Sequence, residues 1–263
     1  MLVEERRQKV LELVTQHGFL SLPDLVKLLK VSDSTVRRDL DYLDEKQLLK
    51  RTHGGAICTG DGIQLPALEE RLTSQLAEKR LIAEKAASRI QDGDTVLLDG
   101  GTTTLEVAKL LVNRSLQIVT NSLPIANLFA NNPKTDLVML GGYVYPKTGV
   151  ALGPVTVRMM EDINVHQTIL SISGINVKGF FNSNMLLVET ERQMMRCAQE
   201  VVVVADHTKV GRQALAFLCD FGSVDMLIVD DQLTPEQRQL LDQTDTKVIL
   251  AGNTNRNGED FSS

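Results

Sequence analysis

The sequence has little cysteine, no tryptophan and no long apolar run. Its three cysteines, Cys58, Cys197 and Cys219, lie far apart without a CxxC pair, which argues against a disulfide framework or a zinc ribbon. The longest apolar runs resemble VVVVA and fall far short of the ~18 to 20 residues of a membrane-spanning helix. The N-terminal MLVEERRQKV contains acids and lacks the apolar stretch of a secretory signal. We therefore expect a cytoplasmic protein with no membrane partner, no metal and no cofactor.

The composition is that of a folded protein with one or two domains. Hydrophobic residues make up 43% of the 263 residues and charged residues 24%, which excludes wholesale disorder. The net charge of −6 is distributed unevenly along the chain. Residues 1–56 contain ten Lys and Arg and nine Asp and Glu, a net charge of +1, whereas the remaining residues carry −7. The average charge therefore does not exclude nucleic acid as a partner of the N-terminal part.

The N-terminal residues have the pattern of three short helices followed by a β-hairpin. Apolar spacing predicts a first helix over roughly 4–16. A second helix, with a proline in its first turn, follows Ser21, and a third covers about 32–45 with a serine as its cap. Residues 48–52 then indicate a strand that turns back at 53–55. This order predicts a winged helix-turn-helix, which binds DNA.

The third helix carries the residues that suit a DNA groove. At ~100° per residue, Val36, Leu40 and Leu43 share one face, and Arg37 and Arg38 lie on the opposite one. Arginines and hydroxyls suit guanine edges and phosphates, although a solvated charged face is the plainer interpretation of an arginine pair alone. The position in a third helix before a basic wing favours DNA. The candidate DNA-binding residues are Ser32, Ser34, Thr35, Arg37, Arg38, Lys50, Arg51 and His53.

The rest of the chain has the sequence pattern of an α/β domain. Short apolar runs alternate with helix-length segments, which is typical of a mainly parallel, doubly wound sheet covered on both faces. A charged helix is predicted over about 69–90, before the first strand. The predicted domains are a winged helix-turn-helix over 1–57, a linker over 58–68, an α/β domain over 69–251 and a disordered tail over 252–263.

A glycine- and threonine-rich segment, DGGTTT at 99–104, follows the first predicted strand and opens a helix. Glycines let the backbone approach an anion, free N–H groups at a helix N-terminus favour negative charge, and threonine hydroxyls donate to phosphate oxygens. The segment matches neither a P-loop nor GxGxxG. Alone it is equally explained as a tight turn with a threonine cap.

Polar and glycine residues also follow the later strands. In an open α/β sheet, ligands bind at the carboxyl ends of the strands, so these residues predict a pocket for a small polyol phosphate. Glu189 is either part of this pocket or the solvated start of a helix. The candidate effector-binding residues are Asp99, Gly100, Gly101, Thr102, Thr103, Thr104, Asn121, Gly141, Gly142, Gly174, Glu189 and Lys209.

Both halves resemble the DeoR family of bacterial transcriptional regulators. TVRRDL and LLKRTHGGA are similar to its recognition helix and wing, and VLLDGGTTTLEVAKLL, IVTNSLPIANLF, VMLGG and VVVVADHTKVG to its sugar-phosphate-sensing domain. The resemblance implies a repressor of a sugar-metabolism operon, with double-stranded operator DNA and a small phosphorylated sugar as partners. It also implies a sensor fold similar to ribose-5-phosphate isomerase and CoA transferases, in which Lys209 matches an isomerase lysine.

Two other functions compete with this interpretation. One is a sugar-phosphate isomerase or deaminase with an accessory DNA-binding domain, but Ser171–Gly174, where the isomerase has paired acids, contains no carboxylate to act as a base. The other is a constitutive DNA-binding protein whose sheet serves only for oligomerisation, against which the threonine loop and Lys209 argue. A single winged unit of net charge +1 is a weak DNA binder, so we expect a homodimer or tetramer on a repeated or palindromic site.

Overall fold

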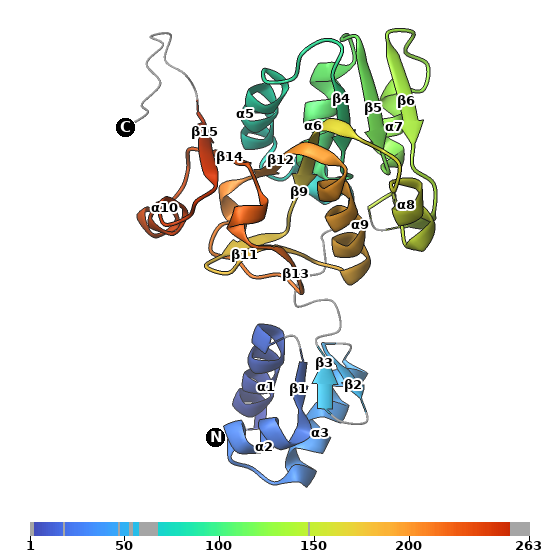
Figure 1. Cartoon of the computed structure of the whole chain (residues 1–263). Coiled ribbons are helices and arrows are strands. Elements are labelled where there is room, and N and C mark those ends of the chain that lie inside the picture. Colours follow the sequence, from blue (N-terminus) through green and yellow to red (C-terminus); the bar gives the residue numbers. More distant parts are fainter. Residues whose placement is uncertain are drawn as a thin grey trace. The chain divides into compact units, whose positions relative to one another are not determined.

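A computed structural model describes residues 3–17, 19–46, 48–52, 55–57, 68–146 and 148–252. The chain forms two compact units, Met1–Gln64 and Leu65–Ser263 (Figure 1). His53, most of the predicted linker and all but the first residue of the predicted tail lie outside the described residues. No helix in the described part is long and apolar enough to cross a membrane.

The N-terminal unit has three helices and a small antiparallel sheet, as predicted for a winged helix-turn-helix. Its sheet has the strand order β1-β3-β2, and its core consists of side chains such as Val14, Leu25, Leu40 and Leu49. The strand β1 is not apparent in the sequence, because only its pairing with β3 makes it a strand. The elements are α1 (Val3–His17), β1 (Phe19–Ser21), α2 (Leu22–Leu29), α3 (Asp33–Glu45), β2 (Lys50–Thr52) and β3 (Gly55–Ile57).

The second unit is built on a seven-stranded sheet in the order β15-β14-β12-β9-β4-β5-β6, in which all neighbouring strands are parallel. Val201 and Val203 pack into one core and Val202 and Val204 into the other, so the sheet is covered on both faces. This confirms the predicted doubly wound fold. The strands are β4 (Thr95–Leu98), β5 (Leu116–Thr120), β6 (Thr135–Met139), β9 (Val165–Ser171), β12 (Ala198–Ala205), β14 (Met226–Asp230) and β15 (Lys247–Ala251).

Helices flank both faces of this sheet. Ile82 of α5 and Val107 of α6 belong to one core, and Val188 of α9 and Leu241 of α10 to the other. Two smaller antiparallel sheets, β7-β8 and β10-β11-β13, extend the second side. The helices are α4 (Leu68–Thr73), α5 (Leu76–Ala87), α6 (Thr102–Leu111), α7 (Leu123–Phe129), α8 (Pro154–Met159), α9 (Met185–Arg196) and α10 (Pro235–Asp242). The smaller strands are β7 (Tyr143–Tyr145), β8 (Val150–Leu152), β10 (Gly174–Asn176), β11 (Gly179–Asn182) and β13 (Ala216–Cys219).

The single helix predicted over 69–90 is wrong, because the segment forms two helices. The chain breaks after α4, and Gln75 has a left-handed backbone with φ of 50°. Buried Lys79 donates hydrogen bonds from Nζ to the carbonyl oxygens of Arg71 and Ser74, both at 2.5 Å. The ammonium group thereby satisfies carbonyls at the end of α4, as basic side chains do at helix C-termini.

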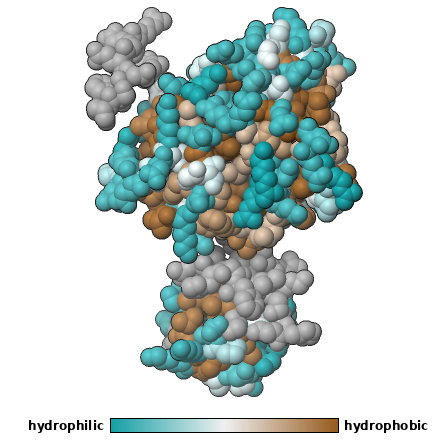
Figure 2. Space-filling model, viewed as in Figure 1, coloured by the Kyte–Doolittle hydropathy of each residue, from teal (hydrophilic) through white to brown (hydrophobic). Residues whose placement is uncertain are grey.

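The surface of the second unit is mixed. Figure 2 shows hydrophobic residues among hydrophilic ones on the visible face. Val177, Leu215 and Phe217 are among the exposed apolar side chains, and they lie on or beside the β10-β11-β13 sheet.

Candidate functional site

The outer face of α3 presents charged side chains to solvent. Ser32 accepts a hydrogen bond from the backbone N–H of Thr35 and so starts the helix. Arg37 and Arg38 are both exposed. Arg37 pairs with Asp33 at 2.5 Å, whereas Arg38 has no ion pair within the described part of the chain. Arg38 is therefore available to a DNA base without first giving up a carboxylate.

The other candidate DNA-binding residues, at the start of α3 and on β2, differ in how freely their side chains can move. The hydroxyl of Ser32 lies 2.8 Å from that of Thr35 and 3.0 Å from that of Ser34, so these groups hold the helix start as well as facing outward. Arg51 on β2 forms an ion pair with Asp41. The side chain of Lys50 lies outside the described residues.

A buried carboxylate holds the recognition helix against the first helix. Asp39 is buried on the inner side of α3. Its two oxygens accept from Arg6 at 2.6 Å and from Arg7 at 3.2 Å. The guanidinium of Arg7 also stacks on the ring of Tyr42, 3.6 Å from its centre. These contacts fix the orientation of α3, and the sequence alone gives no sign that Asp39 is buried.

The order of the strands reverses at β4 in the second unit. The chain runs from β4 to β5 and β6 on one side, and then from β9 to β12, β14 and β15 on the other. The space beyond the carboxyl ends of β4 and β9 is thus the switch point at which open α/β sheets bind ligands. Asp99 follows β4 directly, and Ser171 ends β9.

The two glycines of the DGGTTT segment are required by close packing. A Cβ atom on Gly100 would lie 1.9 Å from a methyl group of Val150, and one on Gly101 would lie 1.8 Å from the hydroxyl of Ser171. Thr104 closes the turn, because its hydroxyl accepts from the N–H of Gly101 at 2.8 Å and lies 2.6 Å from the carbonyl oxygen of Asp99. The tight-turn explanation therefore accounts for both glycines and for one threonine.

The other two threonines are not used in this way. Thr102 and Thr103 form the first turn of α6 and are buried. Neither hydroxyl has a hydrogen-bond partner among the residues that the structure describes. Two hydroxyls beside free helix N–H groups are what an anion needs.

Two buried acids lie at the switch point. Asp99 accepts hydrogen bonds from the hydroxyl of Ser171 at 3.1 Å and from its N–H at 3.4 Å. Glu191 on α9 accepts one from Asn182 at 2.5 Å. Burial raises the pKa of Asp99, and burial together with the nearby charge of Asp99 raises the pKa of Glu191 well above its ordinary value.

The predicted acid on this helix, Glu189, is exposed to solvent. It lies two residues before Glu191, which is about 200° around an α-helix. Packing of Val188 and Met194 into the core sets the helix phase, so Glu191 and not Glu189 turns inward. Glu191, and not Glu189, is therefore the acid of this helix that lies near Asp99.

The other predicted pocket residues fall into two groups. Asn121 is fully buried and donates to the carbonyl oxygen of Ala151 at 3.0 Å, while its own Oδ1 has no partner among the described residues. Two of the three remaining glycines, Gly142 and Gly174, are explained by close packing. A Cβ atom would approach Thr156 to 2.1 Å at Gly142 and the backbone oxygen of Arg212 to 2.4 Å at Gly174, while the carbonyl oxygen of Gly141 accepts from Thr156.

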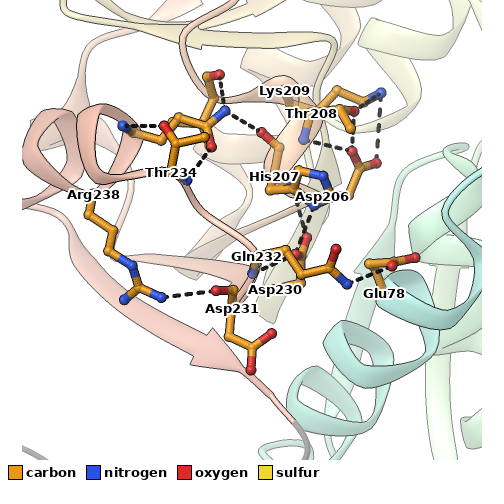
Figure 3. A network of polar contacts seen from close by, with 12 residues as sticks. Glu78, Asp206, His207, Thr208, Lys209, Asp230, Asp231, Gln232, Thr234 and Arg238 are labelled. Atoms are coloured by element: carbon orange, nitrogen blue, oxygen red, sulfur yellow. Dashed lines mark hydrogen bonds and ion pairs between the residues drawn. The ribbon is translucent and has the colours of Figure 1, made fainter.

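Lys209 lies on a well-anchored turn after β12 (Figure 3). Its Nζ is 3.7 Å from Oδ2 of Asp206, the residue that caps the turn. His207 contacts Asp230, at the end of β14, through its ring Nδ1 at 2.9 Å and its backbone N–H at 2.7 Å. The turn thus presents a half-exposed ammonium group at the carboxyl ends of the strands.

Two cations near this edge were missed at the sequence level. Arg71 on α4 is half-buried, and Lys79 on α5 is buried. Burial lowers the pKa of both side chains, while Asp99 acts on Arg71 and Asp206 acts on Lys79 in the opposite direction. Arg71 and Lys79 reach this edge of the sheet only because the chain breaks between α4 and α5. The sequence predicts one continuous helix over this segment and therefore does not place them here. The described residues contain no group of three or more His, Cys, Asp or Glu side chains that could hold a metal ion.

Two family models and several known proteins match most of the chain. The family model "DeoR-like helix-turn-helix domain" matches residues 6–60, and "DeoR C terminal sensor domain" matches residues 74–231. The glycerol-3-phosphate regulon repressor of Escherichia coli is 35% identical over 228 residues, covering 86% of this chain and 90% of that protein. The transcriptional repressor CsqR of the same species is 31% identical over 247 residues, covering 93% and 94%.

Among solved structures, a ribose 5-phosphate isomerase from Methanocaldococcus jannaschii aligns with a TM-score of 0.36 at 17% identity. The alignment covers 52% of this chain and 55% of that one.

Proposed function

Since the chain belongs to the DeoR family of transcriptional regulators, we propose that it is a repressor of a sugar-metabolism operon whose DNA binding is controlled by a phosphorylated sugar. One observation carries the effector part of this proposal: the hydroxyls of Thr102 and Thr103 have no hydrogen-bond partner among the described residues, and they lie at a helix N-terminus at the switch point of the sheet. The relatives also support a phosphorylated effector, because one of them is named for the regulon of a phosphorylated polyol.

The effector would bind with its phosphate on Gly100–Thr104 and the N-terminus of α6. Lys209 would approach the anion from the turn after β12. Asp99 would accept hydrogen bonds from hydroxyl groups, since a carboxylate would repel phosphate. The proposed effector residues are thus those predicted from the sequence, with Glu191 in place of Glu189 and with Gly142 and Gly174 as packing residues that shape the site.

The DNA-binding part would place α3 in a major groove. The proposed contacts come from Ser34, Arg37 and Arg38 on this helix and from Lys50 and Arg51 on the wing, with Ser32 and Thr35 at the helix start and His53 in the wing turn. Because one winged unit with a net charge of +1 binds weakly, we further propose that the protein binds as a homodimer or tetramer. Analytical ultracentrifugation measures the oligomeric state. A protein that is strictly monomeric and still binds its operator tightly would contradict this proposal.

Arg38→Ala should weaken operator binding by about 1–3 kcal/mol, the range expected when a bidentate contact to guanine is lost. Arg37→Ala should cost less, because Arg37 already pairs with Asp33 and must leave it to reach a base. The measurement is fluorescence anisotropy with a duplex selected by the wild-type protein from a random pool. Equal losses on selected and unrelated duplexes would show that Arg38 contacts phosphate rather than a base.

The purified protein should not interconvert ribose 5-phosphate and ribulose 5-phosphate. The loop after β9 offers only Ser171 and Ser173, and proton abstraction needs a base within ~3 Å of the carbon. The nearby acids, Asp99 and Glu191, lie outside this loop, and each is buried and accepts a hydrogen bond from Ser171 or Asn182. A coupled spectrophotometric assay tests this. Turnover that disappears in Glu191→Gln would establish the isomerase alternative instead.

A further inference from the structure

Two buried acids meet at the switch point from elements far apart in the sequence. Asp99 is 3% exposed after β4, and Glu191 is 1% exposed on α9. Asp99 accepts from Ser171, whose carbonyl oxygen accepts from Asn182 at 3.4 Å, and Asn182 in turn donates to Glu191 at 2.5 Å. One serine and one asparagine therefore link the two carboxyl groups.

Neither acid is in direct contact with a cation from the part of the chain that the structure describes. No ion pair joins Asp99 or Glu191 to a Lys, Arg or His among the described residues. The positive charge of Arg71 acts on Asp99 from a distance, and Asp99 and Cys219 are the titratable neighbours of Glu191. Two buried carboxyl groups without a paired cation are costly unless one is protonated or a ligand supplies the charge.

Two buried hydrogen-bond acceptors near the acid pair lack a donor. Oε2 of Glu191 and Oδ1 of Asn121 are buried and have no partner among the described residues. Asn121 follows β5 at the level at which Asp99 follows β4, because Leu98 pairs with Thr120. Both atoms are acceptors, so a ligand that supplies N–H donors would satisfy them.

The three side chains point to one side of the sheet. Leu97 and Val119, two residues before Asp99 and Asn121, pack in the same core as Val188 of α9. Side chains two apart along a strand lie on the same face, so Asp99 and Asn121 are directed to the side on which α9 carries Glu191.

A ligand group with positive charge and several N–H donors would complete this set of acceptors. A hydroxyl group supplies one donor, whereas a primary ammonium supplies three together with a positive charge that compensates one of the two acids. We propose that Asp99 and Glu191, with Asn121, bind the ammonium group of an amino-sugar phosphate and so select this class of effector. This inference rests on the proposed function, because the phosphate of the same effector would occupy the Thr102 and Thr103 end of the site.

Binding of the amine should change the protonation of the acid pair. Burial raises the pKa of both acids, so the pair without ligand holds its protons to a higher pH than free carboxyl groups do. An ammonium group favours the charged form of a carboxylate beside it and so promotes the release of a proton from the pair. Affinity for the amine should therefore rise with pH through the raised pKa of the pair, until the amine of the ligand itself loses its proton.

Isothermal titration calorimetry of the full-length protein tests the subsite directly. Glucosamine 6-phosphate and galactosamine 6-phosphate are each compared with the sugar phosphate that has a hydroxyl in place of the amine. At least one amino sugar should bind about tenfold or more tightly than its hydroxyl match. Titrations in two buffers of different ionisation enthalpy should show a released proton for the amine that is absent for the hydroxyl sugar.

The outcomes separate this inference from the function on which it rests. Hydroxyl sugars that bind as tightly as their amine matches, or amines that bind without proton release, would overturn the paired-acid subsite and leave the proposed function standing. Failure of both classes and of inorganic phosphate to bind would overturn the proposed function as well.

Matched variants locate the preference in the structure. Glu191→Gln keeps the shape of the side chain and removes its charge, so the preference for the amine should fall by about tenfold while affinity for inorganic phosphate stays unchanged. Glu189→Gln, on the exposed side of the same helix and outside the site, should keep the preference. If Glu191→Gln does not fold, Asp99→Asn and the proton count of the wild-type protein decide the question.

Discussion

We expect Asp39→Ala to lower the free energy of unfolding of the N-terminal unit by about 3 kcal/mol and to abolish operator binding. Removing one partner of a buried ion pair costs ~3–5 kcal/mol, because the remaining charge stays buried. The low end applies here, since the side chains of Arg6 and Arg7 are 14% and 24% exposed and can turn partly to water. Hydrogen exchange, followed by mass spectrometry over residues of the N-terminal unit, gives the stability change.

The control for this prediction is Asp41→Ala on the same helix. Asp41 also forms an ion pair, with Arg51, but both side chains are substantially exposed. Exposed ion pairs contribute at most about 1 kcal/mol. If the two variants lose similar stability, the burial of Asp39 does not have the importance that we give it.

The second large effect concerns the response to effector. Thr103→Ala and Lys209→Ala should bind operator DNA like the wild type but no longer respond to the sugar phosphate. Each removes a donor to the anion, and a coupling of about 1–3 kcal/mol between the two sites corresponds to a roughly 5- to 150-fold change in operator affinity. Operator affinity is measured with and without the sugar phosphate that binds the wild-type protein. In a repressor the expected phenotype is an uninducible one.

The neighbouring threonine provides the contrast. Thr104→Ala removes the hydroxyl that closes the turn at Gly101 and should cost about 0.5–2 kcal/mol of stability. A Lys209→Ala protein that still responds at an unchanged sugar-phosphate concentration would mean that the anion site lies elsewhere. Loss of DNA binding in both Thr103→Ala and Lys209→Ala would mean that the loop is purely structural.

The sequence predicts those features that depend on local periodicity. The exposed and buried faces of α3 follow from 3.6 residues per turn, and the structure buries Val36, Leu40 and Leu43 as expected. The doubly wound sheet follows from continuous apolar strands that alternate with helices. These patterns depend only on residues that are close in the sequence, so they can be recognised without knowledge of long-range contacts.

Features that depend on distant contacts were not predicted. The strand β1 exists only because β3 pairs with it, and Asp39 is inside only because Arg6 and Arg7 reach it from α1. Glu189 and Glu191 are the same residue type two positions apart, and only the packing of α9 determines which of them is buried. The break at Gln75 involves no glycine or proline, so its sequence carries no ordinary sign of a helix end.

The position of β4 in the sheet has a consequence for the order in which the protein folds during synthesis. β4 pairs with β5 on one side, but its partner on the other side is β9, some seventy residues later, so the two halves of the sheet cannot join until β9 has left the ribosome. The pairs of the N-terminal unit span at most about forty residues, and local contacts form faster than distant ones. Domains fold in the order of their synthesis. We therefore expect each new molecule to complete its DNA-binding unit before the sheet of its second unit closes.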